Sequence, residues 1–205
     1  MASEAIKKSV AVYYADKLRT FGPTPKGVDW NGAPSQELRF QELMRIIEHK
    51  SVFSILDYGC GYGALFPLLQ KHFQSFAYTG FDIAGEMLAI ASQLHSGNPN
   101  WVSRISDAAP FDYVIASGIF NVQLNHTEPV WKNYILAELG RINGLAKQGF
   151  SFNALTTYSD PERMRCDLYY ADPCFFFDYC KRSFSRNVAL LHDYDLYEFT
   201  ILVRK

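Results

Sequence analysis

The first fifty residues have the apolar spacing of helices. Between residues 3 and 20, apolar side chains recur every three or four positions, as in an amphipathic helix. The positions expected to face inward are Ile6, Val10, Tyr13, Tyr14 and Leu18. Residues 21–34 contain three prolines and three glycines and predict a loop. Ser35 predicts the N-cap of a second helix that ends near Glu48, so residues 1–50 are expected to form a helical lid within the same domain as the rest.

From residue 51 onward, apolar runs of strand length alternate with amphipathic segments. The sequence predicts strands at 51–57, 76–82, 100–105, 111–117 and 150–155. It predicts helices at 63–73, at 84–95 with Gly97 as the stop, and from Thr127 or Glu128 to Gly149. Two further strand-like runs surround a short polar turn in residues 187–205, which indicates an antiparallel hairpin.

The alternation of strands and helices indicates an α/β fold. We expect a Rossmann-like, doubly wound, mainly parallel seven-stranded sheet over residues 51–205, with the hairpin as its antiparallel C-terminal edge. The ligand of such a sheet binds at the carboxyl ends of the strands. One link departs from this pattern, because "SDAAP" at 106–110 is too short to hold a crossover helix. Either that helix is absent or the strand at 100–105 lies elsewhere.

Composition narrows the classes of partner. With 48% hydrophobic and 20% charged residues, the 205-residue chain has the composition of one soluble domain. A net charge of −1 argues against a nucleic-acid-binding surface. The sequence has neither a signal-peptide core nor a membrane-length apolar run, and its four cysteines have no CxxC spacing that would indicate a metal site. We therefore expect a cytoplasmic protein without a metal, nucleic-acid or membrane partner, and the oligomeric state stays open.

The stretch "LDYGCGYG" carries the first chemical signal. Gly59, Gly61 and Gly63 let the backbone approach a ligand beside a helix N-terminus. Gly59, Gly61 and Ala64 also satisfy the dinucleotide pattern G-x-G-x-x-A. Asp57 argues against a dinucleotide, because it would repel a pyrophosphate by on the order of 1 kcal/mol. A ligand with a cationic sulfonium and an ammonium group fits better, which favours S-adenosylmethionine.

Two more aspartates follow the next two predicted strands. Asp82 comes 25 residues after Asp57, one βαβ unit later, where a carboxylate can bind both ribose hydroxyls. A helix N-cap is its alternative role. Asp107 could accept a hydrogen bond from the adenine amine, with the Ala108 N–H donating to a ring nitrogen, or it could simply form a turn. Ser117 and Gly118 end the fourth strand and leave room for a ligand.

Together these motifs resemble those of class I S-adenosylmethionine-dependent methyltransferases. "LDYGCGYG" resembles the first motif of that family, "YTGFDIAGEML" its ribose-binding motif, and "SDAAPFDYVIASGIF" its third and fourth motifs. The resemblance implies S-adenosylmethionine as the cofactor. It also adds Cys60, Ile83 and Met87 to the cofactor contacts.

The helical front piece supplies further candidates. In methyltransferases that this chain resembles, a helix-borne arginine pairs with the methionine carboxylate, and Arg39 is placed to do so; a solvated arginine is the alternative. Trp30 either covers the cofactor or anchors the loop in the core. Tyr13 and Tyr14 either line the acceptor pocket or pack between helices.

The acceptor is expected to be a small molecule that is methylated on nitrogen or oxygen. The sequence "SGIF" after the fourth strand lacks the Asp/Asn-Pro-Pro-aromatic motif of DNA amino-methyltransferases, which disfavours that class. Segment 156–173 is long for a connection and predicts a lid over the site. The predicted acceptor contacts beyond the two front-piece tyrosines are Phe120, Asn121, Tyr158, Tyr169 and Tyr170.

Two histidines are candidates for a general base. His192 begins the hairpin turn and His126 follows the fourth strand, and an imidazole titrates near neutral pH. An ordinary surface histidine is the alternative for each. In-line methyl transfer can rely on positioning and desolvation, so a base is not required. The rival functions are an NAD(P)-dependent oxidoreductase and a cofactor-binding domain without turnover.

Overall fold

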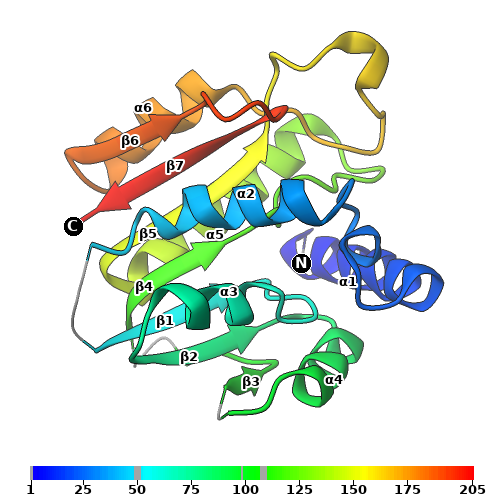
Figure 1. Ribbon diagram of the computed structural model, residues 1–205. Coiled ribbons are helices and arrows are strands. Elements are labelled where there is room, and N and C mark those ends of the chain that lie inside the picture. Colours follow the sequence, from blue (N-terminus) through cyan, green and yellow to red (C-terminus); the bar gives the residue numbers. More distant parts are fainter. Residues whose placement is uncertain (1, 49–51, 98, 107–109) are drawn as a thin grey trace.

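The computed structural model describes residues 2–48, 52–97, 99–106 and 110–205. At its centre is one seven-stranded sheet, whose place between the helices is seen in Figure 1. The strand order is β3-β2-β1-β4-β5-β7-β6. The strands are β1 Phe53–Tyr58, β2 Phe76–Phe81, β3 Asn100–Val102, β4 Phe111–Ala116, β5 Ala146–Leu155, β6 Asn187–Leu191 and β7 Glu198–Arg204. β1 to β5 are parallel, and β7 pairs antiparallel with both β5 and β6. The predicted fold class is confirmed.

Six α-helices and two short 3₁₀ helices are seen in the described residues. They are α1 Ala2–Phe21, α2 Ala33–Met44, α3 Leu65–His72, α4 Gly85–Leu94, α5 Glu128–Leu145 and α6 Pro173–Ser183, with 3₁₀ turns at Pro25–Val28 and Pro161–Arg163. The sequence did not predict α6, whose N-terminus is capped by the Asp172 carboxylate. No described helix is both long enough and apolar enough to span a membrane.

Two predicted helix ends were wrong. Ser35 is not the N-cap of α2; Gly32 occupies that position, and the Ser35 hydroxyl donates to the Gly32 carbonyl from within the first turn. Helix α5 ends at Leu145 and not at Gly149. Gly149 instead lies inside β5. A β-carbon at Gly149 would lie 2.6 Å from the Val203 carbonyl oxygen, so close packing against β7 accounts for that glycine.

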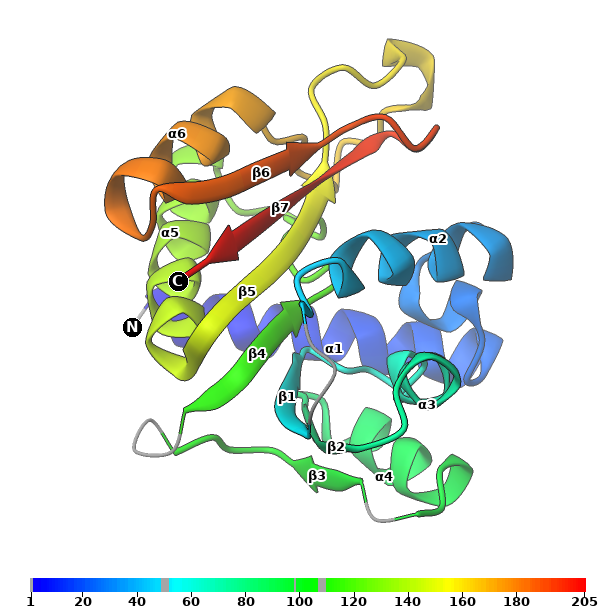
Figure 2. The same cartoon turned by 60° about the vertical axis from the view of Figure 1, so that its left-hand side comes forward.

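The two faces of the sheet are covered by different helices. On one face, Leu43 and the nearby Ile46 pack with α3 and with Ile55 of β1. On the other face, α5 contributes Trp131, Ile135 and Leu139 to the larger core cluster. Helix α2 therefore belongs to the α3 face, and α5 covers the opposite one (Figure 2).

Helix α1 occupies the face that a crossover helix between β3 and β4 would cover. The described residues of that connection, 103–106 and 110, contain no helix, and β3 pairs parallel with β2 as predicted. Ile6 and Val10 of α1 join the core cluster that contains Tyr58 of β1 and Phe81 of β2. The front piece thus straddles the sheet, with α1 on one face, α2 on the other, and the segment between them at the carboxyl edge.

Candidate active site

A cavity lies at the carboxyl ends of β1, β2 and β4, where a ligand of this fold is expected. The loops after these strands form one wall, and α1, α2 and the segment between them form the other. Ten of the predicted cofactor contacts line it: Trp30, Asp57, Gly59, Cys60, Gly61, Asp82, Ile83, Met87, Ser117 and Gly118. Asp107 and Ala108, predicted to bind adenine, lie outside the described residues.

The glycine loop is attached to the end of β2. The backbone N–H groups of Gly59 and Cys60 both donate to the Phe81 carbonyl oxygen, at 2.8 and 2.9 Å. Gly59 has a φ of +82°, and a β-carbon there would lie 2.3 Å from the Ile119 side chain, so glycine is required. Gly63 does not line the cavity; Trp101 packs where its side chain would be.

Asp82 holds the loop in place and faces the cavity at the same time. Its Oδ2 accepts from the Gly61 N–H and its Oδ1 from the Ala84 N–H, both at 2.8 Å. Burial raises the pKa of this carboxyl, while backbone N–H donors oppose that shift. The alternative role of Asp82 as the N-cap of α4 is wrong, because Ala84 occupies that position without a side-chain cap and Asp82 fixes the turn before the helix. Each carboxylate oxygen still has a second lone pair for a ligand hydroxyl.

Asp57 has fewer hydrogen-bond donors around its buried carboxyl group in the described structure than Asp82 has. It is 2% exposed, and Tyr78 donates a hydrogen bond to its Oδ2 at 2.7 Å. Burial raises the pKa of Asp57 to about 7, and the charge of Asp82 adds to the shift. Among the described residues, neither aspartate has an ion-pair partner. The cavity therefore contains two buried acids that a cationic ligand would stabilise.

The loop after β4 meets the segment between α1 and α2 (residues 22–32, the covering segment) at Gly118. This residue has a φ of +71°, and a β-carbon on it would lie 2.3 Å from the Trp30 ring, which therefore packs directly on its backbone (the two residues share the cavity wall). The neighbouring Ser117 hydroxyl is buried and has no hydrogen-bond partner in the described part of the chain. It is a free polar group in the cavity wall.

Arg39 is placed differently from its predicted role. It is 5% exposed, does not line the cavity, and forms a bidentate ion pair with Glu198 at 2.7 Å. Its guanidinium also stacks on the Trp30 ring, 3.9 Å from the centroid. Only its Nη1 lacks a partner among the described residues.

Sequence comparison establishes the family. The profile of a family described as "Methyltransferase domain" matches residues 55–142, which span the strands and loops around the cavity. The protein named "Putative methyltransferase Rv1506c" from Mycobacterium tuberculosis (strain ATCC 25618 / H37Rv) is 51% identical over 166 residues, covering 79% of this chain and 99% of that protein. The chain belongs to the methyltransferase family. The resemblance to class I S-adenosylmethionine-dependent methyltransferases is thereby confirmed, and membership decides against the dinucleotide oxidoreductase.

Solved structures agree on the fold of this methyltransferase. Magnesium protoporphyrin IX methyltransferase (ChlM) from Synechocystis PCC 6803, solved with bound SAH, matches with a TM-score of 0.64 at 16% identity, over 98% of this chain and 99% of that chain. Human N-acetylserotonin methyltransferase, in complex with SAM, matches with a TM-score of 0.60 at 15% identity, over 98% of this chain and 66% of that chain.

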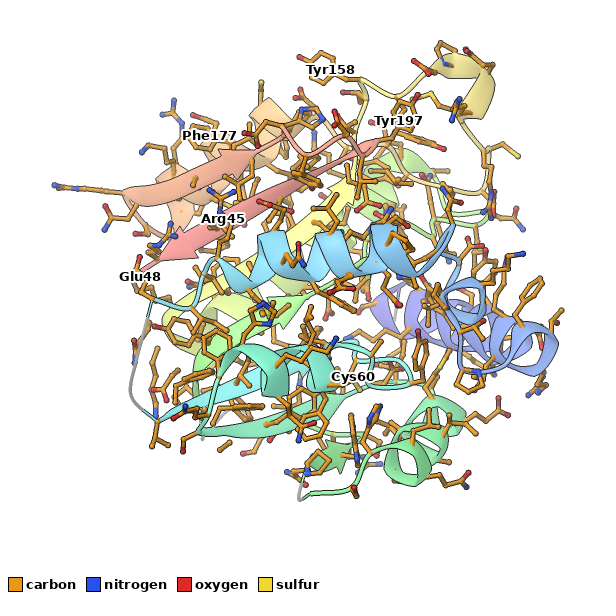
Figure 3. All side chains as sticks on the ribbon, in the orientation of Figure 1. Arg45, Glu48, Cys60, Tyr158, Phe177 and Tyr197 are labelled. Atoms are coloured by element: carbon orange, nitrogen blue, oxygen red, sulfur yellow. The ribbon has the colours of Figure 1, made fainter. Side chains whose placement is uncertain are left out.

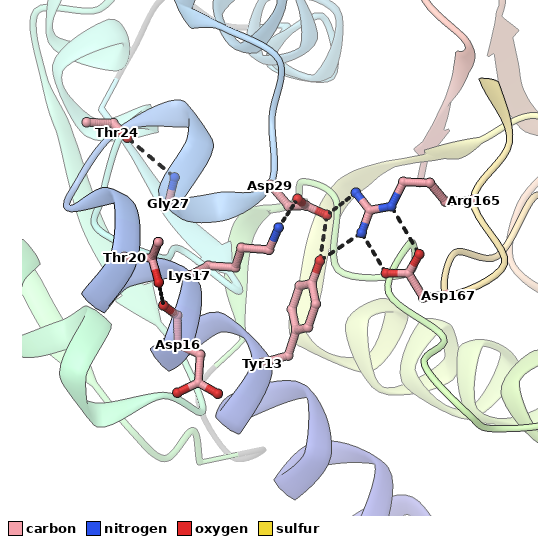
Figure 4. Close-up of polar contacts among 9 residues, drawn as sticks. All are labelled: Tyr13, Asp16, Lys17, Thr20, Thr24, Gly27, Asp29, Arg165 and Asp167. Carbon is pink, nitrogen blue, oxygen red and sulfur yellow. Dashed lines mark hydrogen bonds and ion pairs between the residues drawn. The ribbon is translucent and has the colours of Figure 1, made fainter.

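Most of the predicted acceptor contacts of the methyltransferase lie away from the cavity. Tyr14 lines it, whereas the Tyr13 hydroxyl donates to Asp29 outside it (Figure 4). Tyr158 is 69% exposed and projects from the outer edge, far from Cys60 (Figure 3). The others have structural contacts. Phe120 and Tyr169 are in the core, Asn121 accepts from the Leu155 N–H, and the Tyr170 hydroxyl accepts from the Arg165 N–H.

Neither candidate base reaches the cavity of the methyltransferase. His126 Nε2 lies 3.1 Å from the Ser9 hydroxyl, and its ring stacks on Trp131. His192 is exposed, with its ring near Tyr158 and Phe199. No histidine is found in the cavity wall formed by the described residues.

A polar cluster on the α1 side of the cavity was not predicted. Glu138 of α5 pairs with Lys7 of α1 at 2.7 Å and accepts a hydrogen bond from the Tyr58 hydroxyl at 2.5 Å. All three line the cavity. Helical spacing places Glu138 on the buried side of α5, between Ile135 and Ile142, and a charged residue at such a position was the available signal.

Proposed function

We propose that this methyltransferase transfers the methyl group of S-adenosylmethionine to a nitrogen or oxygen atom of a small molecule, with the cofactor bound in the cavity. The observation that carries the proposal is the buried pair Asp57 and Asp82, which lacks a protein cation among the described residues. A sulfonium and an ammonium would offset the cost of two buried carboxylates. The anionic pyrophosphate of a dinucleotide would increase it.

Each wall of the cavity has a proposed partner in the cofactor. The glycine loop and Asp57 would hold the aminoacyl arm, and Asp82 would accept hydrogen bonds from the ribose hydroxyls. Ile83 and Met87 would supply apolar contacts to the nucleoside. Asp107 and Ala108 remain proposed contacts of adenine.

The cofactor carboxylate would be bound from the β4 side. Ser117 offers an unpartnered buried hydroxyl in the cavity wall, and Arg39 Nη1 is an unpartnered donor behind Trp30. Because the other nitrogens of Arg39 bind Glu198 and its side chain lies outside the cavity lining, we propose that Nη1 is the one donor that it could direct to the cofactor carboxylate.

The transfer would be an in-line displacement. A lone pair on the acceptor attacks the methyl carbon, the carbon–sulfur bond breaks, and S-adenosylhomocysteine leaves with the electron pair. The acceptor proton passes to solvent, and positioning supplies much of the acceleration. A small acceptor is supported by the substrates named for two structural neighbours, magnesium protoporphyrin IX and N-acetylserotonin. Tyr14 is the proposed aromatic contact.

Thermal unfolding with a panel of ligands tests the cofactor. S-adenosylmethionine and S-adenosylhomocysteine at a hundred times their dissociation constants should stabilise the protein by about 2.7 kcal/mol, while NAD and NADP should not. A shift with NAD alone would contradict the proposal. Release of S-adenosylhomocysteine in an acceptor screen distinguishes an enzyme from a binding domain without turnover.

A further inference from the structure

The polar side chains behind the cavity form a closed ring of contacts. Asn153 Oδ1 accepts from the Gly118 N–H at 2.8 Å, and Asn153 Nδ2 donates to Glu198 Oε2 at 2.6 Å. Glu198 pairs with Arg39, Arg39 stacks on Trp30, and Trp30 packs back on Gly118. The ring joins five parts of the chain: α2, the covering segment, the loop after β4, strand β5 and the start of β7.

Three members of this ring, Arg39, Asn153 and Glu198, are buried and do not line the cavity. Asn153 is fully buried, and Glu198 is 1% exposed. The amide of Asn153 has one orientation that satisfies both neighbours, because its oxygen must face an N–H and its NH₂ a carboxylate. A buried carboxylate is costly unless it is fully paired, and the hydrogen bonds and ion pair seen for the Glu198 carboxylate in the described structure all lie within this ring. The ring therefore holds the side chains of Asn153 and Glu198 in one arrangement.

The other two residues of the ring face the cavity. Trp30 and Gly118 both line the cavity, and each is held by one end of the Arg39–Glu198–Asn153 chain. A shift of Asn153 would free the Gly118 backbone, and a shift of Glu198 would free the cation on which Trp30 rests.

We propose that Asn153 and Glu198 are positioning residues for the cofactor, which act through Gly118 and Trp30 without touching it. The inference rests on the proposed function, since it takes the cavity to be the S-adenosylmethionine site. Asn153 fixes the end of β4, Glu198 orients Arg39, and together they keep the indole of Trp30 closed over the ligand.

The variant Asn153→Ala opens the ring and keeps the Arg39–Glu198 pair. Ser151→Ala is the matched control, because Ser151 lies two residues earlier in β5, is fully buried, and donates to the Leu43 carbonyl of α2 outside the ring. Calorimetric titration with S-adenosylhomocysteine should give about tenfold weaker binding for Asn153→Ala and less than about twofold for Ser151→Ala. Asn153→Ser is measured in parallel as a smaller perturbation, and a thermal melt of each variant confirms that it is folded.

A double-mutant cycle with Trp30→Ala shows whether Asn153 acts through the indole. If it does, Asn153→Ala should weaken binding little further once Trp30 has been removed. Equal affinity losses for Asn153→Ala and Ser151→Ala, or losses that multiply in the cycle, would overturn the positioning role. Wild-type protein that binds neither S-adenosylmethionine nor S-adenosylhomocysteine would instead overturn the proposed function, which separates the two failures.

Discussion

Helices α1 and α2 come from the same front segment but are attached to the sheet in different ways. α2 buries Phe40 and Leu43 in the α3-side core and joins β7 through a buried ion pair, Arg39 with Glu198. α1 also buries apolar side chains, namely Ile6, Val10 and Leu18, but its polar contacts to the rest of the chain, among them those of Asp29, are partly exposed (Figure 4). The comparison indicates that α2 is part of the framework, and that α1 is the more easily displaced cover of the cavity.

The largest loss of stability is expected when the buried ion pair of α2 is removed. Within the described part of the chain, Arg39→Ala leaves the buried Glu198 carboxylate with Asn153 as its remaining partner, which should cost about 3–5 kcal/mol. Urea unfolding followed by circular dichroism measures the loss. Arg45→Ala is the matched control on the same chain segment, because Arg45 is half exposed and its guanidinium pairs, among the residues that the structure describes, only with Glu42. This variant should cost at most about 1 kcal/mol. Similar losses for both variants would mean that the Arg39 pair is not what fixes α2.

The next largest effect is expected at Asp29, which ties α1 to the loop after β5. Its carboxylate accepts from Tyr13 and Lys17 of α1 at 2.7 Å and from Arg165 at 2.9 Å (Figure 4). Asp29→Ala should cost about 2 kcal/mol and speed hydrogen exchange in α1 while leaving α2 unchanged. Asp29→Asn is the control, because asparagine also tolerates the φ of +62° found there. Faster exchange in both helices would show that they unfold together.

The sequence could predict features that have a local pattern, but not contacts between residues far apart in the chain. The glycine loop, Asp82 and the strands carry local signals, since spacing of two or of three to four residues is visible within a short window. Helix α6 was missed because its three phenylalanines are consecutive and lack a helical period. The Arg39–Glu198 pair joins residues 159 apart, and no short-range pattern specifies it. The role of α1 in place of a crossover helix likewise depends on tertiary packing of Ile6 and Val10.

The two sides of the cavity differ in charge as well as in packing. On the α1 side Glu138 is neutralised by Lys7, while Asp57 on the sheet side has no cation in the described structure. With its pKa raised to about 7, Asp57 is mostly protonated at pH 6 and mostly ionised at pH 8. A cation binds the ionised form better, so affinity for S-adenosylmethionine should rise about tenfold from pH 6 to pH 8 and then level off.

Calorimetric titration across this pH range checks the charge comparison. Asp57→Asn should flatten the profile, whereas Glu138→Gln should retain the rise, because Glu138 is already paired with Lys7. The stability of the ligand-free protein should change in the opposite direction. The folded state binds the Asp57 proton more tightly than the unfolded state, so this contribution is present below about pH 4 and is lost as pH rises through 7. A pH-independent affinity in the wild type would remove Asp57 from cation binding.

The smallest effect is expected at the far end of α1. Arg19 forms an ion pair with Glu86 of α4 at 2.7 Å and with Asp16 at 2.6 Å, but all three side chains are largely exposed. Solvent screening and the entropy of two long side chains offset most of the attraction. Arg19→Ala should therefore leave the urea midpoint unchanged within error at 0.5 M salt, with at most a slight decrease at low salt. A large loss that persists in high salt would show that α1 is clamped along its whole length, and the helix would then belong to the framework together with α2.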